Sequence, residues 1–230
     1  MDLSGPGWLT PALLIAAAYL VGSVPASYLV GRLAKGIDIS EHGSGNIGVS
    51  NLTAQAGALW AAPAVAFDVL VKGALPVFIA SDRVLGLGIG VEVVAGLAGT
   101  AGHNWSVFSG FRGGRGMATA LGVTGTLNFP LLIVYGSVPA LGVLVTPWKD
   151  SAVWWLIAVV LMPVWAAVLN LPVEIIWYAA AFAVVTATKR MTSNSLKGTD
   201  GNITFKLLGT RLLFDRDIAD RKTWLDQARE

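Results

Sequence analysis

The sequence contains no cysteine and only two histidines among its 230 residues. The absence of cysteine excludes disulfide bonds, thiolate metal sites and a thiol nucleophile. Charged residues are also scarce, at 13% of the chain, whereas soluble domains carry about 25%. Because 54% of the residues are hydrophobic, the chain has too little polar surface for an aqueous domain. We therefore predict an all-α membrane protein.

Seven apolar stretches are candidates for membrane helices, for which about 20 residues is the usual length. They cover residues 10–34, 59–80, 84–102, 117–127, 129–147, 152–170 and 173–188. Pro130 separates the fourth stretch from the fifth, because proline removes a helix hydrogen bond. The first eight residues, MDLSGPGW, carry no basic cluster, so we expect no signal peptide there. The sequence predicts a polytopic protein with about seven transmembrane helices, several of them short.

Lysine and arginine are distributed unevenly between the loops. If the N-terminus is outside, 14 of the 16 Lys and Arg residues fall on the inner side. Basic residues concentrate on the cytoplasmic side of membrane proteins, so we predict an outside N-terminus and a cytoplasmic C-terminus. We divide the chain into a transmembrane domain at 1–188 and a basic cytoplasmic tail at 189–230. The tail pattern fits either an amphipathic surface helix or a solvated tail.

A glycine-rich stretch, GSGNIG at 43–48, matches the G-x-G-x-x-G pattern of dinucleotide sites. It follows an apolar span and no β-strand, which excludes a Rossmann site. A second stretch, GHNWSVFSGFRGGRGMAT at 102–119, lies on the same predicted face of the membrane. Glycines let backbone N–H groups converge on an anion, so we interpret both stretches as phosphate-binding loops. The alternative is a pair of ordinary interfacial turns whose arginines meet lipid headgroups.

Three ionisable residues lie inside predicted spans, where charged groups need partners. Asp68 and Lys72 are one helical turn apart, and Glu92 lies in the next span. We predict that Lys72 pairs with Asp68, with Glu92 or with both, and an ion or proton pathway is the alternative. His103 follows the third span, so it is either a general base or phosphate donor, or a helix C-cap that orients the loop.

Four stretches together resemble one known family. They are GSVPASYL at 22–29, GIDISEHGSGNIGVSN at 36–51, FDVLVKGALPV at 67–77 and GHNWSVFSGFRGGRGMATALG at 102–122. These stretches are similar to PlsY, the family of bacterial acyl-phosphate:glycerol-3-phosphate acyltransferases. The resemblance implies a seven-helix enzyme of the bacterial inner membrane with its active face in the cytoplasm. It also implies the reaction, in which an acyl chain moves from acyl phosphate to the 1-hydroxyl of glycerol 3-phosphate and gives lysophosphatidic acid for phospholipid biosynthesis.

From the residues and the resemblance together we assign candidate site residues. The predicted catalytic residues are Ser44, Ser50, His103 and Arg115. The predicted substrate-binding residues are Gly43, Gly45, Asn46, Gly48, Asn51, Arg112, Gly113, Gly114 and Lys189. We expect the catalytic residues and Asn51 to converge on one cytoplasm-facing pocket. No metal or cofactor is implied, and the expected partners are the two phosphate substrates and membrane lipid, with no nucleic acid.

The third motif of the family, near the end of the last span, differs in this chain. Thr188 stands where the family has histidine, and Met191 stands where it has asparagine. Ala54 likewise replaces an arginine of the first motif, and Arg115 replaces a lysine of the second. The alternative hypothesis is therefore a PlsY-derived, non-catalytic membrane subunit that binds a protein partner in a larger complex.

Overall fold

The computed structural model describes residues 7–192, 203–220 and 223. Within these residues the secondary structure is helical apart from one isolated bridge between Ser106 and Arg112. The helices are α1 (Leu9–Gly22), α2 (Ala26–Lys35), α3 (Val49–Ala56), α4 (Ala58–Ala66), η1 (Phe67–Ala74), α5 (Leu75–Ala80), α6 (Ile89–Asn104), η2 (Val107–Ser109), α7 (Met117–Leu127), α8 (Phe129–Val145), α9 (Ser151–Val168), α10 (Val173–Thr192) and α11 (Phe205–Phe214). The expectation of an all-α fold is confirmed for this part of the chain.

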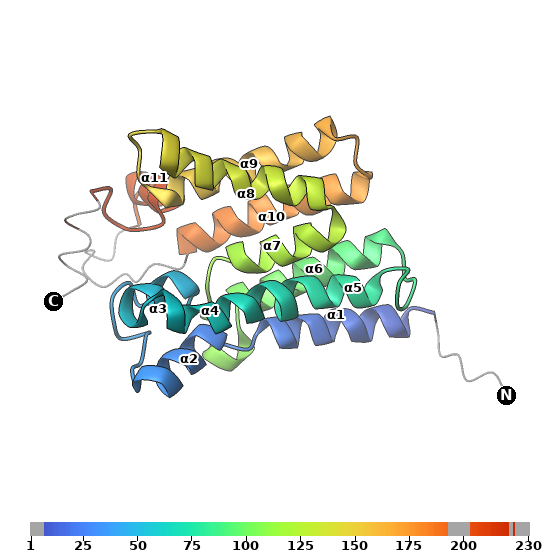
Figure 1. Cartoon of the computed structure of the whole chain (residues 1–230), viewed down its shortest axis with the longest axis horizontal. Helices are drawn as coiled ribbons and strands as arrows, with labels where there is room; N and C mark the ends of the chain where they lie inside the picture. The colour runs from blue at the N-terminus through green and yellow to red at the C-terminus, as the bar shows by residue number, and fades with distance from the viewer. Residues whose placement is uncertain (1–6, 193–202, 221–222, 224–230) are drawn as a thin grey trace.

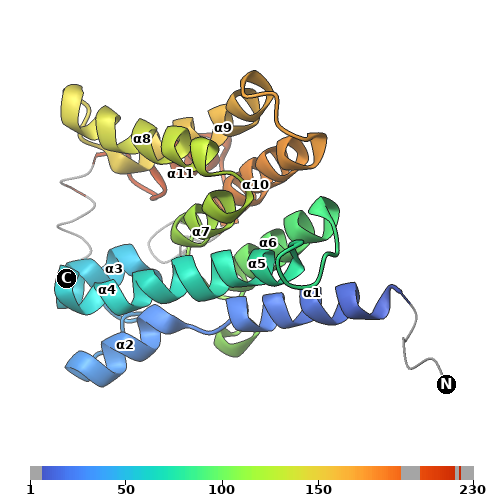
Figure 2. The same cartoon turned by 45° about the vertical axis from the view of Figure 1, so that its right-hand side comes forward.

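The long helices run side by side in a bundle (Figure 1). α1 lies at one edge of the bundle and packs against α6. α8 and α9 lie at the opposite edge, and α7 and α10 lie between the two edges (Figure 2). Three helical stretches of the described residues are long and apolar enough to cross a membrane: Leu9–Lys35, Ala58–Ala80 and Ser151–Val168. Two further apolar helices, Met117–Leu127 and Phe129–Val145, are shorter.

The first predicted span, 10–34, is broken into α1 and α2. α1 ends at Gly22 and α2 begins at Ala26, after Pro25. Proline lacks a backbone N–H and disfavours helical backbone in the residue before it, so the helix cannot run through this point. The carbonyl of Ser23, which the break frees, accepts a hydrogen bond from the Ser106 hydroxyl. The break therefore joins the first span to the second glycine-rich loop.

The second predicted span, 59–80, forms one continuous helical stretch from Ala58 to Ala80. Its middle, η1, is a π-helix over Phe67–Ala74. π-helical turns are rare, occur mostly as short insertions within α-helices and are frequently found at functional sites. This π-helix carries Asp68 and Lys72, both buried.

The third predicted span, 84–102, begins five residues before the helix that the structure shows. α6 begins only at Ile89, because residues 81–88 form a turn. The Ser81 carbonyl accepts backbone hydrogen bonds from Val84 and Gly86, at 3.0 and 2.9 Å. Gly88 precedes α6 with φ +83°, a conformation that glycine adopts without strain. At the other end α6 continues through His103 to Asn104, so the prediction of His103 as a helix C-cap is wrong.

The later spans agree closely with the sequence. α7 covers Met117–Leu127, as predicted, and α8 begins at Phe129, so that Pro130 separates the two helices. α9 covers Ser151–Val168 against a predicted 152–170. α10 covers Val173–Thr192 and so continues past the predicted domain boundary at residue 188. The tail contains one described helix, α11, and Trp224 of the predicted amphipathic pattern lies outside the described residues.

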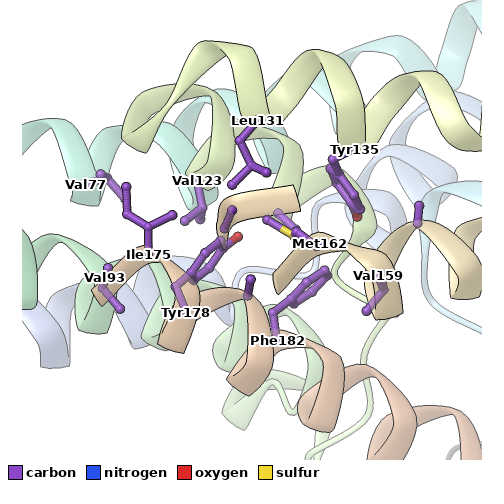
Figure 3. Packing of buried hydrophobic residues seen from close by; sticks show 14 residues of the cluster. Val77, Val93, Val123, Leu131, Tyr135, Val159, Met162, Ile175, Tyr178 and Phe182 are labelled. Carbon is purple, nitrogen blue, oxygen red and sulfur yellow. The ribbon is translucent and has the colours of Figure 1, made fainter. Parts of the chain in front are cut away.

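The hydrophobic core lies where α8, α9 and α10 meet α6 and α7 (Figure 3). Phe182 stacks with Tyr178 at a centroid distance of 6.2 Å and meets the edge of Tyr135 at 6.3 Å. The Tyr178 hydroxyl is 3.3 Å from the hydroxyl of Thr124, so this buried polar group has a partner. Each aromatic pair contributes about 0.5–1.5 kcal/mol beyond burial, and the core fixes α10 against α7.

Glycine contacts let helix backbones approach closely elsewhere in the bundle, as small residues do in membranes. A Cβ added to Gly22 of α1 would lie 2.2 Å from the Gly99 carbonyl oxygen of α6. An added Cβ at Gly122 of α7 would lie 1.9 Å from the Val69 carbonyl oxygen of η1. The backbones of α6 and α7 therefore leave no room for a methyl group beside α1 and η1.

Candidate active site

The first glycine-rich loop, residues 39–48, is closed by the side chain of Asn51. Its amide nitrogen lies 2.7 Å from the Ile39 carbonyl oxygen and 3.0 Å from those of His42 and Asn46. Asn51 is buried in the first turns of α3. Its N–H donors are occupied by the loop itself, so Asn51 determines the shape of the loop in this structure.

The same loop is anchored at its start by Asp38. This carboxylate accepts hydrogen bonds from the Ser40 hydroxyl at 2.5 Å and from the Ser40 amide at 3.0 Å. It also pairs with Arg32 of α2 at 2.6 Å. The hydrogen bond from the Ser40 hydroxyl is the main cause that holds the pKa of Asp38 below its usual value. Asp38 is therefore the ionised anchor of the loop.

The remaining predicted residues of the first loop differ in exposure. Ser44 and Ser50 are exposed, and the Ser44 hydroxyl accepts a weak hydrogen bond from the Asn46 amide at 3.4 Å. The side-chain oxygen of Asn46 is buried without a hydrogen-bond partner. Gly43 and Gly45 have φ values of +58° and +66°, which glycine adopts without strain. Ser44 is thus exposed on a loop backbone that requires glycine, and Ser50 is exposed in the first turn of α3.

The second glycine-rich loop folds back on the end of α6. The Gly114 amide donates to the His103 carbonyl at 3.2 Å. An added Cβ at Gly113 would lie 2.1 Å from that same carbonyl oxygen, and one at Gly114 would lie 2.2 Å from His103 Nε2. Both glycines therefore lie directly against His103. Arg112 lies next to them, and its side chain is exposed.

The two loops, far apart in the sequence, meet in space. An added Cβ at Gly48 would lie 3.4 Å from the Cα of Gly114. Between the loops and the α1–α2 break lies a small pocket with a volume of about 10 Å³, which is roughly the space for one water molecule. It is lined by Gly22, Ser23, Val24, Pro25, Ala26, Ser27, Ile47, Asp68, Lys72, His103, Ser106, Gly113 and Gly114. The predicted residues His103, Gly113 and Gly114 line this pocket, whereas Ser44, Ser50, Asn51 and Arg115 do not.

A buried charge cluster forms one wall of the pocket. Lys72 Nζ lies 2.8 Å from Asp68 Oδ1, which confirms the predicted pair. His103 Nδ1 lies 3.5 Å from the same oxygen and 3.3 Å from Lys72 Nζ. Glu92 is not the partner of Lys72. Lys72 contacts His103 near the end of α6, whereas Glu92 lies eleven residues earlier on the same helix, a distance of about 16 Å along its axis. The helices bring Asp68, Lys72 and His103 together as one polar group.

A second group of charges joins the second loop to the C-terminal segment. Arg115 Nε lies 2.6 Å from Asp215 Oδ1, just after α11. Lys189 of α10 is buried, and its Nζ lies 5.3 Å from the ring centroid of Trp105. Lys189 also lies within electrostatic range of both Arg115 and Asp215. Arg115, predicted as catalytic, and Lys189, predicted as substrate-binding, therefore lie in one charged group, in which Arg115 is paired with a carboxylate of the protein.

Three arginines help to hold the C-terminal segment, residues 203–220, where Asp215 meets Arg115. Arg190 donates to the carbonyls of Ala152 and Leu212, at 2.9 and 3.0 Å, and so bridges α9 and α11. The other two arginines form ion pairs at 2.6 Å, Arg211 with Asp217 and Arg216 with Asp150.

The family model described as "Glycerol-3-phosphate acyltransferase" matches residues 12–198. The chain belongs to this family. Its curated relatives include glycerol-3-phosphate acyltransferase 4 of Dehalococcoides mccartyi strain CBDB1, which is 34% identical over 94% of this chain and 93% of the relative. Another is the glycerol-3-phosphate acyltransferase of Shouchella clausii strain KSM-K16, 36% identical over 76% of this chain and 86% of the relative.

A solved structure supports the same family assignment. The chain is similar to the glycerol 3-phosphate form of PlsY (YgiH), an integral membrane glycerol 3-phosphate acyltransferase. The two share a TM-score of 0.71 and 28% identity, over 79% of this chain and 88% of that chain. The lysophosphatidic acid form of the same protein matches with a TM-score of 0.70. The resemblance to PlsY is confirmed, and this member of the family is a multi-pass membrane protein.

Sequence reasoning missed the place of Asp68 and Lys72 in the pocket wall. The prediction paired them correctly but treated them as a structural ion pair inside a span. Ionisable residues within membrane segments are functional candidates by default, and that signal was present in the sequence. The sequence analysis also missed Asp215, because no sequence pattern links Asp215 to Arg115, which is 100 positions away.

Proposed function

We propose that this chain transfers an acyl chain from acyl phosphate to the 1-hydroxyl of glycerol 3-phosphate, giving lysophosphatidic acid and phosphate. The observation that carries the proposal is the contact between the two glycine-rich loops at Gly48 and Gly114. We further propose that the chain crosses the bacterial inner membrane seven times, with this end of the bundle in the cytoplasm. The two substrates each bear a phosphate, and two adjoining loops suit a pair of such groups.

The proposed chemistry needs positioning and charge neutralisation. The 1-hydroxyl oxygen forms a bond to the acyl carbon, the bond from that carbon to the phosphate oxygen breaks, and the phosphate leaves with the electron pair. The hydroxyl proton passes to a nearby base or to a phosphate oxygen. Because phosphate is already a good leaving group, the protein need not form a covalent intermediate, and holding the hydroxyl oxygen against the face of the acyl carbonyl provides most of the catalysis.

The described residues suit these tasks in different ways. The amide of Gly113 offers a donor beside the pocket, and Arg115 and Lys189 offer positive charge. The exposed hydroxyls of Ser44, in the first loop, and Ser50, in the first turn of α3, offer neutral donors. We propose that His103 acts mainly by holding the second loop, since its ring faces Asp68, Lys72 and Gly114.

Phosphate release from the purified protein tests this function. The full chain in lipid nanodiscs is supplied with acyl phosphate and glycerol 3-phosphate, and the expected result is phosphate release that requires both substrates. Arg115→Ala should reduce the rate at least tenfold, because a charged hydrogen-bond donor to phosphate is lost. Absence of release from a protein that unfolds cooperatively would remove the transferase proposal.

The second candidate function is a non-catalytic membrane subunit, favoured by the positions where this chain departs from the family motifs. Ala54 and Thr188 are exposed, and the Met191 carbonyl accepts from Arg211 of the C-terminal segment. If phosphate release is absent, the variant Ala54→Arg/Thr188→His/Met191→Asn tests whether these substitutions are the cause. Release from that variant alone, together with copurification of the wild type in a larger complex, would support the subunit function.

Asp215→Asn is expected to tighten phosphate binding. In the structure the Asp215 carboxylate occupies Arg115, so a substrate phosphate has to compete with it. A partly exposed ion pair contributes up to about 1 kcal/mol, so the KM for glycerol 3-phosphate should fall about threefold to fivefold. Steady-state kinetics measures this, with Asp220→Asn as the control that removes one negative charge from the same segment. A raised KM would show that Asp215 positions Arg115 for the substrate.

A further inference from the structure

The cluster of Asp68, Lys72 and His103 is buried and lines the pocket, and a structural ion pair requires neither feature. Asp68 and Lys72 are 1% and 2% exposed, and all three side chains line the pocket between the loops. The second carboxylate oxygen of Asp68 is buried without a hydrogen-bond partner. Burying a charge pair costs more in desolvation than an apolar pair of the same size, so stability alone does not account for its presence.

The backbone that carries Asp68 and Lys72 is packed closely against two neighbouring helices. Asp68 and Lys72 lie on the π-helix η1, a rare backbone conformation that is frequently found at functional sites. An added Cβ at Gly99 of α6 would lie 2.3 Å from the Lys72 carbonyl oxygen. On the other side of η1, an added Cβ at Gly73 would lie 2.2 Å from the Thr119 carbonyl oxygen of α7. The π-helix is therefore held between α6 and α7, and its two charges have fixed positions.

The cluster reaches the second glycine-rich loop through His103. One edge of the imidazole, Nδ1, faces Asp68 and Lys72, and the other edge, Nε2, faces Gly114. The His103 carbonyl accepts the Gly114 amide and lies against Gly113. The orientation of this ring, set by the two charges, therefore determines where the glycine backbone can lie.

We propose that Asp68 and Lys72 are positioning residues for the second glycine-rich loop. They hold the His103 ring against Gly114, and through it they hold the amides of residues 113, 115 and 116 in the arrangement that receives a substrate phosphate. The inference rests on the proposed function for its substrate, an acyl phosphate or glycerol 3-phosphate. The positioning of the loop amides is a property of the protein itself and is measurable without turnover.

The test separates positioning from stability by removing one charge and then both. Asp68→Asn leaves Lys72 buried without its counter-charge, and we expect a lower unfolding temperature together with lower activity. Asp68→Asn/Lys72→Met removes both charges, and we expect the unfolding temperature to recover. Transfer by this double variant should nevertheless remain at least tenfold below wild type. Tyr178→Phe, which removes a buried hydroxyl in the core away from the loops, is the control and should retain activity.

Hydrogen–deuterium exchange gives a second measurement that does not depend on turnover. In the double variant the amides of residues 113–116 should exchange about tenfold faster than in wild type, whereas those of α8 should be unchanged. His103→Gln, which leaves the Asp68–Lys72 pair intact, should show the same faster exchange even if the double variant does not fold. Wild-type exchange at 113–116 in either folded variant would overturn the proposal, as would recovery of full activity in the double variant. If the wild type releases no phosphate, the function fails, and the exchange data still decide the positioning.

Discussion

Gly113→Ala is expected to reduce phosphate release by a factor of about one hundred or more, since a displacement near 1 Å in a catalytic group costs about that much. The added methyl would lie 2.1 Å from the His103 carbonyl oxygen and 2.5 Å from that of Asn104. Both are backbone atoms at the end of α6 and cannot rotate away. The loop has to move outward instead, which breaks the Gly114 amide hydrogen bond to His103 and displaces the donors proposed for phosphate.

The effect should be specific to activity. The loop lies at the end of the bundle, outside the core of α8, α9 and α10, so the unfolding temperature should fall only slightly. Gly209→Ala on α11 is the matched control, because an added Cβ there has no neighbour within 4 Å. Initial rates of phosphate release in nanodiscs measure both variants. A Gly113→Ala protein with a wild-type rate would show that this loop does not hold a substrate.

Gly122→Ala is expected to have the largest effect on stability. Its added methyl would lie 1.9 Å from the Val69 carbonyl oxygen and 2.9 Å from the Ala74 backbone nitrogen, both on η1. Overpacking of a rigid interface costs about 1–3 kcal/mol and occasionally more, and contact with backbone on both sides places this variant at the upper end. The separation of α7 from η1 would also move Asp68 and Lys72, so activity should fall with stability.

Gly90→Ala is the control for this prediction. Gly90 lies in the first turn of α6 with no heavy atom within 4 Å of an added Cβ. Alanine is favoured over glycine in a helix by about 1 kcal/mol, so this variant should be neutral or slightly stabilised. Unfolding in mixed micelles with increasing denaturing detergent compares the two proteins. Equal stability of Gly122→Ala and Gly90→Ala would show that α7 and η1 are less tightly packed than the structure shows.

Much of the helical architecture could be predicted from the sequence, because apolar run length and proline positions are local signals. Pro130 marks the boundary between α7 and α8 correctly, and α7 begins at Met117 as expected. The break before α2 is visible in the sequence as Pro25, but a long apolar run favoured one uninterrupted span. The π-helix at Phe67–Ala74 has no pattern of its own, since its hydrogen bonds depend on packing against α6 and α7.

The candidate site could be predicted only as two loops and a list of residues. Spacing indicates that Asp68 and Lys72 share a helix face, but only the packing of α6 against η1 brings His103 to them. Asn51 matched a binding pattern, yet its amide points back to the carbonyls of its own loop. Such hydrogen bonds depend on the final path of the backbone, which residue types alone do not specify.

The pairing of Arg115 with Asp215 has a consequence for biosynthesis. These residues are separated by 100 positions, so Arg115 leaves the ribosome long before its carboxylate partner is translated. This pair therefore closes only after the C-terminal segment has been translated, and a polypeptide that ends before residue 215 lacks the carboxylate that pairs with Arg115.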